Sequence, residues 1–303
     1  MSSDVTADYL ALRRDVGAVD LPRDVIRVSG PQAVQWLHDL LSQNVSGLSV
    51  GASALSLVLQ PQGKLVALVR VTRVADDAVV VDTDTGWGAK VADHLARFKL
   101  RTKADVERLD WRCVALRGPR AHDAVPGPSG EGPVVAAADW PGLPGVDLLG
   151  PDPEPPKDVR RCSTDAYEAV RIEAGVPVMG READEGTMPH ELGIVDRAVD
   201  MAKGCYVGQE LVARVDARGG HSPRFLRGVV VARNVVPPVG ATVREPGGGP
   251  DRGRVTSVAE SLDRHAPVGL AIVQRALEPP ADVELAWEGG TAPARLESLP
   301  LVS

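Results

Sequence analysis

Two short segments of the chain share one residue pattern, and this likeness constrains the architecture more than any other feature. Segment 28–33 (VSGPQA) resembles segment 116–121 (LRGPRA), and each follows an apolar run that predicts a strand. Pro31 suits the first position of a helix. Internal similarity indicates a repeated structural unit, so we expect two related α+β lobes. Coincidence is the alternative, because Gly-Pro before a helix is common.

Hydrophobic periodicity predicts the elements of the first lobe. Alternating and β-branched residues favour strands, whereas apolar residues at helical spacing favour helices. The expected elements are a strand at 25–28, a helix at 31–45, a hairpin of 53–60 and 64–74, a strand at 78–82, a helix at 85–100 and an edge strand at 104–109.

The rest of the chain changes character twice. A helix is expected from its N-cap Ser163 to its C-cap Gly175, followed by an irregular stretch at 176–207 and a short helix. From Arg224 onward, short β-runs separated by turns are typical of a small barrel. The predicted domains are 1–110, an α+β lobe, 111–222, a second α+β lobe, and 223–303, a C-terminal β-barrel.

Charge and cysteine content exclude several function classes. The net charge is −7 and no run of five like charges occurs, which predicts no direct nucleic-acid binding. Cys113, Cys162 and Cys205 stand far apart, as expected in a reducing compartment. Three cysteines are too few for an all-cysteine zinc or cluster site, and the six histidines are scattered, so no metal site is predicted.

The sequence shows neither a secretory signal nor a membrane-spanning segment, and this predicts the compartment. The N-terminal residues contain acids and no apolar core, unlike a secretory signal. No apolar run approaches the roughly 18 residues needed to span a bilayer. We therefore expect a cytoplasmic protein without membrane contact.

Segment 203–210 (KGCYVGQE) carries the strongest local chemistry. Gly204 and Gly208 permit a tight backbone path, and Gly208 is expected to open a helix whose first turn contains Glu210. Cys205 would then lie near a helix N-terminus and close to Lys203, and both lower a thiol pKa. The hypothesis is a reactive or ligand-contacting Cys205. The alternative is a small buried thiol beside a structural turn.

Two carboxylates have a similar double interpretation. Glu173 and Glu191 could each accept paired hydrogen bonds from a ring edge that carries N–H and NH₂ donors, such as that of a pterin. A helix-end ion pair is the alternative for Glu173, and an ordinary first-turn acid is the alternative for Glu191. His190 is interpreted as a solvated loop histidine.

At these segments the sequence resembles the YgfZ family, including its mitochondrial relatives in iron–sulfur cluster assembly. KGCYVGQE is the family signature, and 171–177 (RIEAGVP) and 188–193 (MPHELG) match the segments before it. The blocks at 25–45 and 57–69 resemble the family's N-terminal lobe, and 267–274 (PVGLAIVQ) resembles a barrel strand. The resemblance implies the α+β T-protein fold, with two related lobes around a central folate channel and a small C-terminal β-barrel.

The resemblance also implies a ligand and its contacts. The cofactor would be tetrahydrofolate or a one-carbon derivative, and Glu173 matches the folate-contacting glutamate. The signature residues and two weaker arginine assignments complete the implied site: Arg171, Lys203, Gly204, Cys205, Tyr206, Gly208, Gln209, Glu210 and Arg214. Packing or a surface ion pair is the alternative role for the two arginines. Tyr206, Tyr167 and Trp140 are the candidates for stacking on a pterin.

One departure from T-proteins bears on activity. In T-proteins, the stretch after the first hairpin turn resembles G-G-x-x-D-D, and an aspartate of this motif assists one-carbon transfer. The corresponding residues here run from Gly63 to Leu68, and Ala67 and Leu68 replace the acids. Without a carboxylate to polarise an amine, glycine cleavage is not expected.

Three functions remain in view. The first is a folate-binding accessory protein that supports iron–sulfur enzymes or their assembly machinery, with any effect on tRNA modification indirect. The second is a folate-dependent aminomethyltransferase or other one-carbon transferase. The third is a folate-independent thiol catalyst or scaffold. The sequence leaves open whether any reaction is catalysed.

Overall fold

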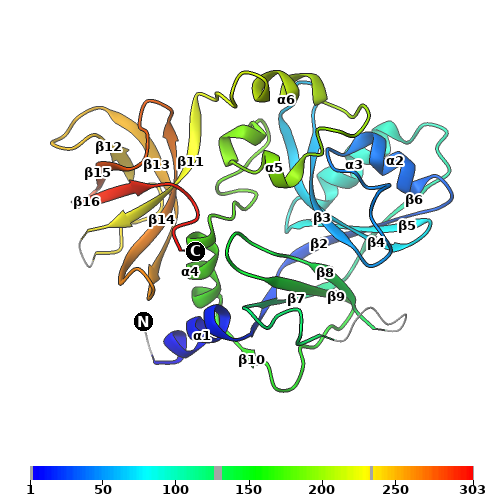
Figure 1. The fold of residues 1–303 in the computed structure, drawn as a ribbon, viewed down its shortest axis with the longest axis horizontal. Helices are drawn as coiled ribbons and strands as arrows, with labels where there is room; N and C mark the ends of the chain where they lie inside the picture. Colours follow the sequence, from blue (N-terminus) through cyan, green and yellow to red (C-terminus); the bar gives the residue numbers. More distant parts are fainter. Residues whose placement is uncertain (1–2, 126–131, 233–234, 303) are drawn as a thin grey trace.

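The computed structural model describes residues 3–125, 132–232 and 235–302, which form two five-stranded sheets and a closed barrel (Figure 1). The first-lobe sheet has the strand order β3-β4-β5-β2-β6. Its strands are β2 (Arg23–Ser29), β3 (Ser53–Leu59), β4 (Leu65–Ala75), β5 (Ala78–Asp84) and β6 (Asp105–Leu109), and its helices are α2 (Ala33–Leu40) and α3 (Gly88–Lys99). The predicted hairpin and edge strand are confirmed.

The second-lobe sheet has the order β10-β1-β7-β9-β8. Its strands are β1 (Gly17–Leu21), β7 (Arg112–Arg117), β8 (Val134–Ala137), β9 (Gly145–Gly150) and β10 (Arg160–Arg161), and it packs with α1 (Ser3–Arg14) and α4 (Thr164–Ala174). Ser163 accepts a hydrogen bond from the Ala166 amide, and Gly175 is left-handed, so both predicted caps of α4 are confirmed.

The C-terminal barrel is closed in the order β11-β14-β13-β12-β15-β16. Its strands are β11 (Arg224–Val231), β12 (Thr242–Arg244), β13 (Asp251–Ser261), β14 (Ala266–Gln274), β15 (Ala281–Trp287) and β16 (Gly290–Glu297). Helix α4 contacts β13 and β14, and Figure 1 shows it between the barrel and the two lobes. The predicted barrel is confirmed.

Helix lengths differ from the sequence predictions. Helix α2 covers Ala33–Leu40 rather than 31–45, so Pro31 lies in the preceding turn, and α3 begins at Gly88 rather than 85. Residues 119–124 form turns, not the helix expected after Gly118-Pro119. Segments 28–33 and 116–121 therefore share a strand followed by a turn, but not a helix after it.

The two glycines of the repeat nevertheless share one conformation. Gly30 has φ 127° and Gly118 has φ 129°. A β-carbon would lie 2.8 Å from the Lys103 carbonyl oxygen at Gly30 and 2.3 Å from the Asp15 carbonyl oxygen at Gly118. Both positions thus require glycine because a neighbouring backbone passes too close for a side chain.

Two segments cross the predicted boundary between the lobes. Residues 3–21 precede the first-lobe sheet in the chain, yet α1 and β1 pack with the second lobe. Residues 179–212 follow the second lobe but pack on β3 and β4 of the first through an apolar cluster. This segment contains the helical turns η1 (Pro189–Leu192) and α5 (Val195–Ala198), and α6 (Gln209–Asp216) closes it. The domain limits stay a prediction.

Candidate functional site

A central cavity of about 280 Å³ lies between the two lobes. Strands of both sheets, helix α4 and segment 176–197 supply its walls. Its volume is near the lower end of the range of small-molecule pockets, roughly 300 Å³. The charged and aromatic residues that line it are Arg23, Arg70, Asp84, Arg117, Asp139, Trp140, Asp147, Tyr167, Arg171 and Arg197.

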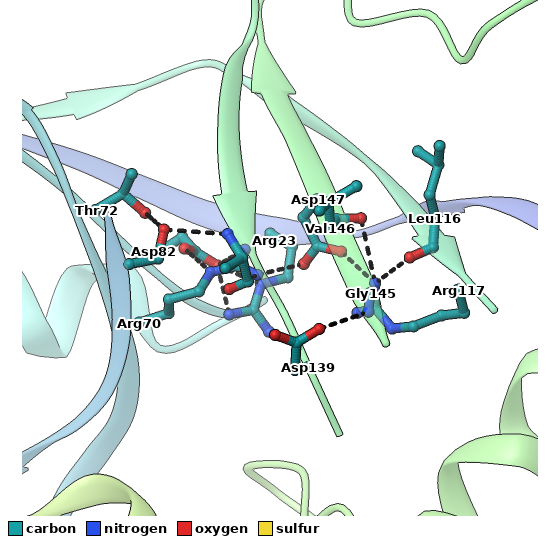
Figure 2. Close-up of polar contacts among 12 residues, drawn as sticks. Arg23, Arg70, Thr72, Asp82, Leu116, Arg117, Asp139, Gly145, Val146 and Asp147 are labelled. Atoms are coloured by element: carbon teal, nitrogen blue, oxygen red, sulfur yellow. Dashed lines mark hydrogen bonds and ion pairs between the residues drawn. The ribbon is translucent and has the colours of Figure 1, made fainter. Parts of the chain in front are cut away.

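Buried ion pairs join the two lobes (Figure 2), and Arg70, Arg117 and Asp147 of these pairs line the cavity. Arg70 donates to Asp82 from Nε at 2.9 Å and pairs through Nη1 with Asp147 Oδ2 at 2.8 Å. Arg117 Nη1 lies 2.6 Å from Asp147 Oδ1. Asp147 therefore bridges an arginine of the first lobe and one of the second.

The electrostatics of Asp147 reflect those two partners. Burial alone raises the pKa of a carboxyl group, but the Arg117 and Arg70 guanidinium groups outweigh burial and hold the pKa of Asp147 below its usual range. The carboxylate thus stays ionised although it is only 3% exposed.

Arg171 belongs to a second paired cluster in the cavity wall. Its guanidinium donates to Glu168 Oε2 at 3.0 Å, to Glu182 Oε2 at 3.2 Å and to Ser257 Oγ at 2.7 Å. These bonds tie α4 to segment 176–182 and to barrel strand β13. Arg171, assigned to the ligand by resemblance, thus lines the cavity with its donors already engaged.

Arg197 is the exception to this pairing. Among the residues that the structure describes, its guanidinium has no carboxylate or hydrogen-bond acceptor, and burial alone lowers its pKa. A partly buried guanidinium without a counter-ion has lost part of its hydration, which costs free energy. A bound anion would offset that cost. Its planar donors match carboxylate or phosphate groups.

Two aromatic side chains stand at the same cavity. Trp140 and Tyr167 contact edge to face with ring centroids 5.2 Å apart, and the Arg117 guanidinium lies 4.4 Å from the Trp140 centroid. Of the three stacking candidates, Trp140 and Tyr167 line the cavity, whereas Tyr206 is not among its lining residues.

The position of the acids found in T-proteins is apolar and lies at the cavity wall. Leu68 lines the cavity, while Ala67 is fully buried in the first-lobe core. The three lining carboxylates are engaged: Asp84 accepts from Arg23 and the Met179 amide, Asp139 contacts His122 and accepts from the Gly145 amide, and Asp147 pairs with two arginines.

Glu173 lies elsewhere. It faces α1 and the barrel, where its Oε1 accepts hydrogen bonds from Tyr9 Oη at 2.6 Å and from Ser261 Oγ. Burial raises the pKa of this carboxyl group. Glu173 is not a lining residue of the central cavity, and its contact with a pterin stays a prediction.

The signature segment packs against the first lobe, outside the cavity lining. Gly208 is the left-handed N-cap of α6, as predicted, and a β-carbon there would lie 2.6 Å from the Gln60 carbonyl oxygen. Lys203 donates to main-chain carbonyls at the end of α2 rather than to Cys205. Its burial lowers its pKa to about 8.

The remaining signature residues divide by exposure. Cys205 is exposed, so the alternative of a small buried thiol is wrong. Tyr206 is buried, its hydroxyl has no hydrogen-bond partner among the described residues, and burial raises its pKa to about 12. Gly204, Glu210 and Arg214 are exposed and Gln209 is half-buried. Ligand contacts by these residues stay predictions.

Two residues of the MPHELG segment are buried. His190, interpreted from sequence as a solvated loop histidine, is 6% exposed, and the prediction is wrong because η1 packs under α6 and β11. Glu191 accepts from Arg224 Nε at 2.8 Å, which fits an ion-pairing role.

Apart from Arg171, the sequence analysis missed the arginines that line the cavity. A charged residue inside an apolar strand is rarely buried unless it is paired, and Arg70, Asp82 and Asp147 each stand in such a run. That pattern predicts a buried ion pair, although it does not pair the residues. Within residues 3–125, 132–232 and 235–302, no three His, Cys, Asp or Glu side chains form a metal-binding group.

Comparison with known proteins places this geometry in a wider context. Residues 1–130 match the family model of the GCVT N-terminal domain. The structure superposes on glycine cleavage system aminomethyltransferase T from Bartonella henselae with a TM-score of 0.82 and 20% identity, covering 98% of this chain and 89% of the other. The chain has the T-protein fold. The predicted α+β fold class is thereby confirmed.

The names of the curated relatives include two different functions. An aminomethyltransferase of Bordetella petrii is 26% identical over 331 residues, covering 97% of this chain and 87% of the relative. A mitochondrial iron–sulfur cluster assembly factor IBA57 homolog of Chaetomium globosum is 27% identical over 234 residues, covering 67% of this chain and 54% of the relative. No helix in the described part of the T-protein-like chain is long and apolar enough to cross a membrane.

Proposed function

We propose that this protein binds tetrahydrofolate or a one-carbon derivative in the central cavity. The observation that carries the proposal is that an unpaired guanidinium, Arg197, lines the same cavity as Trp140 and Tyr167. A reduced folate offers a flat ring for the aromatic edge and carboxylates for Arg197. The residues present therefore fit the cofactor that the fold family implies.

The cofactor would supply one-carbon carrier chemistry, while the chain supplies binding and orientation. Arg171 would hold α4, and with it Tyr167, against the cavity through its bonds to Glu182 and Ser257. The buried pairs of Asp147 would keep the two walls at a fixed spacing.

We further propose that the folate-bound form of this protein supports iron–sulfur proteins or their assembly machinery, as a YgfZ-type factor. The signature at 203–210, the exposed Cys205 and the similarity to an iron–sulfur assembly factor support this role. The test is twofold: calorimetric titration with tetrahydrofolate, and iron–sulfur enzyme activity in a deletion strain. Saturable binding with lowered enzyme activity is expected, whereas normal activity in the strain would count against the role.

Aminomethyl transfer is the alternative that the names of several relatives favour. We expect no product from an aminomethyl donor and tetrahydrofolate, because Leu68 stands at the cavity wall and Asp84, Asp139 and Asp147 are engaged. A discontinuous assay for methylenetetrahydrofolate measures this. Product formation by the wild-type protein would revive the transferase.

The thiol alternative rests on Cys205 acting without folate. Cys205→Ser complementation of the deletion strain addresses it, since retained function would exclude an essential thiol. Function lost in Cys205→Ser but kept in a variant that no longer binds folate would favour a folate-independent thiol catalyst or scaffold.

The role of Glu173 can be separated into stability and binding. Glu173→Gln is expected to lower the free energy of unfolding by about 1–3 kcal/mol, because Tyr9 and Ser261 lose a charged acceptor. Urea denaturation measures this loss. Tyr9→Phe is the matched control, since it removes one of the same hydrogen bonds and keeps the carboxylate. Weaker folate binding in Glu173→Gln alone would reveal a direct contact.

A further inference from the structure

The Lys203 side chain ends in a cage of main-chain carbonyl oxygens. Its Nζ donates to the carbonyl oxygen of Leu41 at 2.6 Å, to that of Gln43 at 3.1 Å and to that of His38. These carbonyls belong to the last turn of α2 and the residues after it. The final carbonyls of a helix lack partners within the helix and carry its negative partial charge, so they attract a cation.

The cage has the composition of a monovalent-cation site. Among the residues that the structure describes, the ammonium has three hydrogen-bond acceptors, all of them neutral oxygens, and the Tyr206 ring centroid lies 5.1 Å from Nζ. Asp39 and Asp200 act on the ammonium only through space. Carbonyl oxygens that replace a hydration shell are the ligands by which proteins hold potassium, and an aromatic face adds to cation binding.

We propose that the carbonyls of His38, Leu41 and Gln43 form a monovalent-cation site that the chain fills with its own Lys203 ammonium group. Lys203 is then a positioning residue. It fixes the start of the signature segment against α2, while Gly208 fixes the other end against the hairpin turn at Gln60. Cys205 lies between these two anchors. The cation site itself does not depend on the proposed function. Only the functional importance of holding Cys205 in place rests on that proposal.

The anchoring has a second component at the start of the segment. Asp200 Oδ1 accepts hydrogen bonds from the Ala202 amide at 2.8 Å and from the Lys203 amide at 3.1 Å. The Asp200 amide in turn donates to the Ser42 carbonyl at 3.0 Å. The backbone of Lys203 is thus held beside the cage, so a small cation could replace the ammonium without large movement.

The experiment uses Lys203→Met, which keeps the unbranched stem and removes the charge. In tetramethylammonium chloride, whose cation is too large for the cage, amides of segments 38–46 and 199–209 should exchange hydrogen at least about tenfold faster than in the wild type, because charged hydrogen bonds are lost. Ammonium or potassium chloride at equal ionic strength should restore most of the protection, because either cation can take the place of the Lys203 ammonium group.

Two controls make the outcome specific. Lys64→Met removes an exposed lysine from the hairpin turn and should leave exchange in both segments unchanged in every salt. The wild type should respond equally to tetramethylammonium, ammonium and potassium chloride, because its cage is filled. Equal protection of Lys203→Met in ammonium and tetramethylammonium would overturn the proposal.

A folding defect would not remove the test. If Lys203→Met is not recovered from tetramethylammonium buffer, recovery of folded protein in ammonium buffer supports the cage, and failure in both buffers contradicts it. Tetrahydrofolate titration of the same samples keeps the two proposals apart. Cation rescue without folate binding in the wild type would retain the cage and reject the folate function.

Discussion

Replacing Asp147 by asparagine should lower the free energy of unfolding by about 3–5 kcal/mol, since the variant leaves two buried arginines without their shared counter-ion. Arg70 and Arg117 both pair with Asp147, and each is less than a tenth exposed. Chemical denaturation followed by circular dichroism measures the change. This is the largest stability effect that we expect from a single substitution in the cavity.

Asp152→Asn is the control for Asp147→Asn. Asp152 pairs with Arg112 at 2.8 Å on the surface, where both side chains are exposed, and such pairs contribute no more than about 1 kcal/mol. Similar losses in the two variants would contradict the bridging role of Asp147.

Acid should erase the difference between the wild type and Asp147→Asn. The pKa of Asp147 is depressed in the folded protein, so its stabilising contribution is present above the ordinary aspartate pKa of about 3.9. That contribution falls as the pH drops from there toward the folded pKa. Denaturation at several pH values should therefore show the two curves converging below about pH 4.

Replacing Arg197 by methionine should affect binding and stability in opposite directions. The affinity for tetrahydrofolate should fall about ten- to hundredfold, as expected for a lost charge-assisted hydrogen bond. The free energy of unfolding should stay the same or rise, because the variant no longer contains a partly buried guanidinium without a counter-ion. Calorimetric titration and urea denaturation measure the two quantities.

Arg218→Met separates the local effect from the change in net charge. Arg218 is exposed beyond α6, and its loss changes the net charge by the same amount. Its affinity and stability should match the wild type. Unchanged folate affinity in Arg197→Met would show that this guanidinium does not meet the ligand.

Local pattern was sufficient for most of the secondary structure. Alternation identified β3, β4 and β5, and the cap residues Ser163 and Gly175 marked both ends of α4. These features depend on neighbours a few residues apart, so sequence alone carries them. Helix α2 was predicted too long: the backbone becomes extended at Leu41, whose carbonyl oxygen accepts from Lys203, and the local pattern does not contain so distant a contact.

The candidate site shows the opposite balance. The signature at 203–210 and the resemblance to YgfZ and T-proteins drew attention to Cys205 and Glu173, yet neither residue lines the central cavity. The cavity is built from Arg70, Asp147 and Arg197, whose strands and turns belong to three separate parts of the chain. Their pattern in sequence marks them as unusual without showing which charges meet.

The sequence by itself determined the order of strands and helices from β2 to β6, the change to a C-terminal barrel and the absence of an acid at Ala67 and Leu68. Only the tertiary structure decided which charges are neutralised. It pairs Arg70 and Arg117 through Asp147 and leaves Arg197 unpaired, because pairing depends on distances of a few ångströms between residues far apart in the chain.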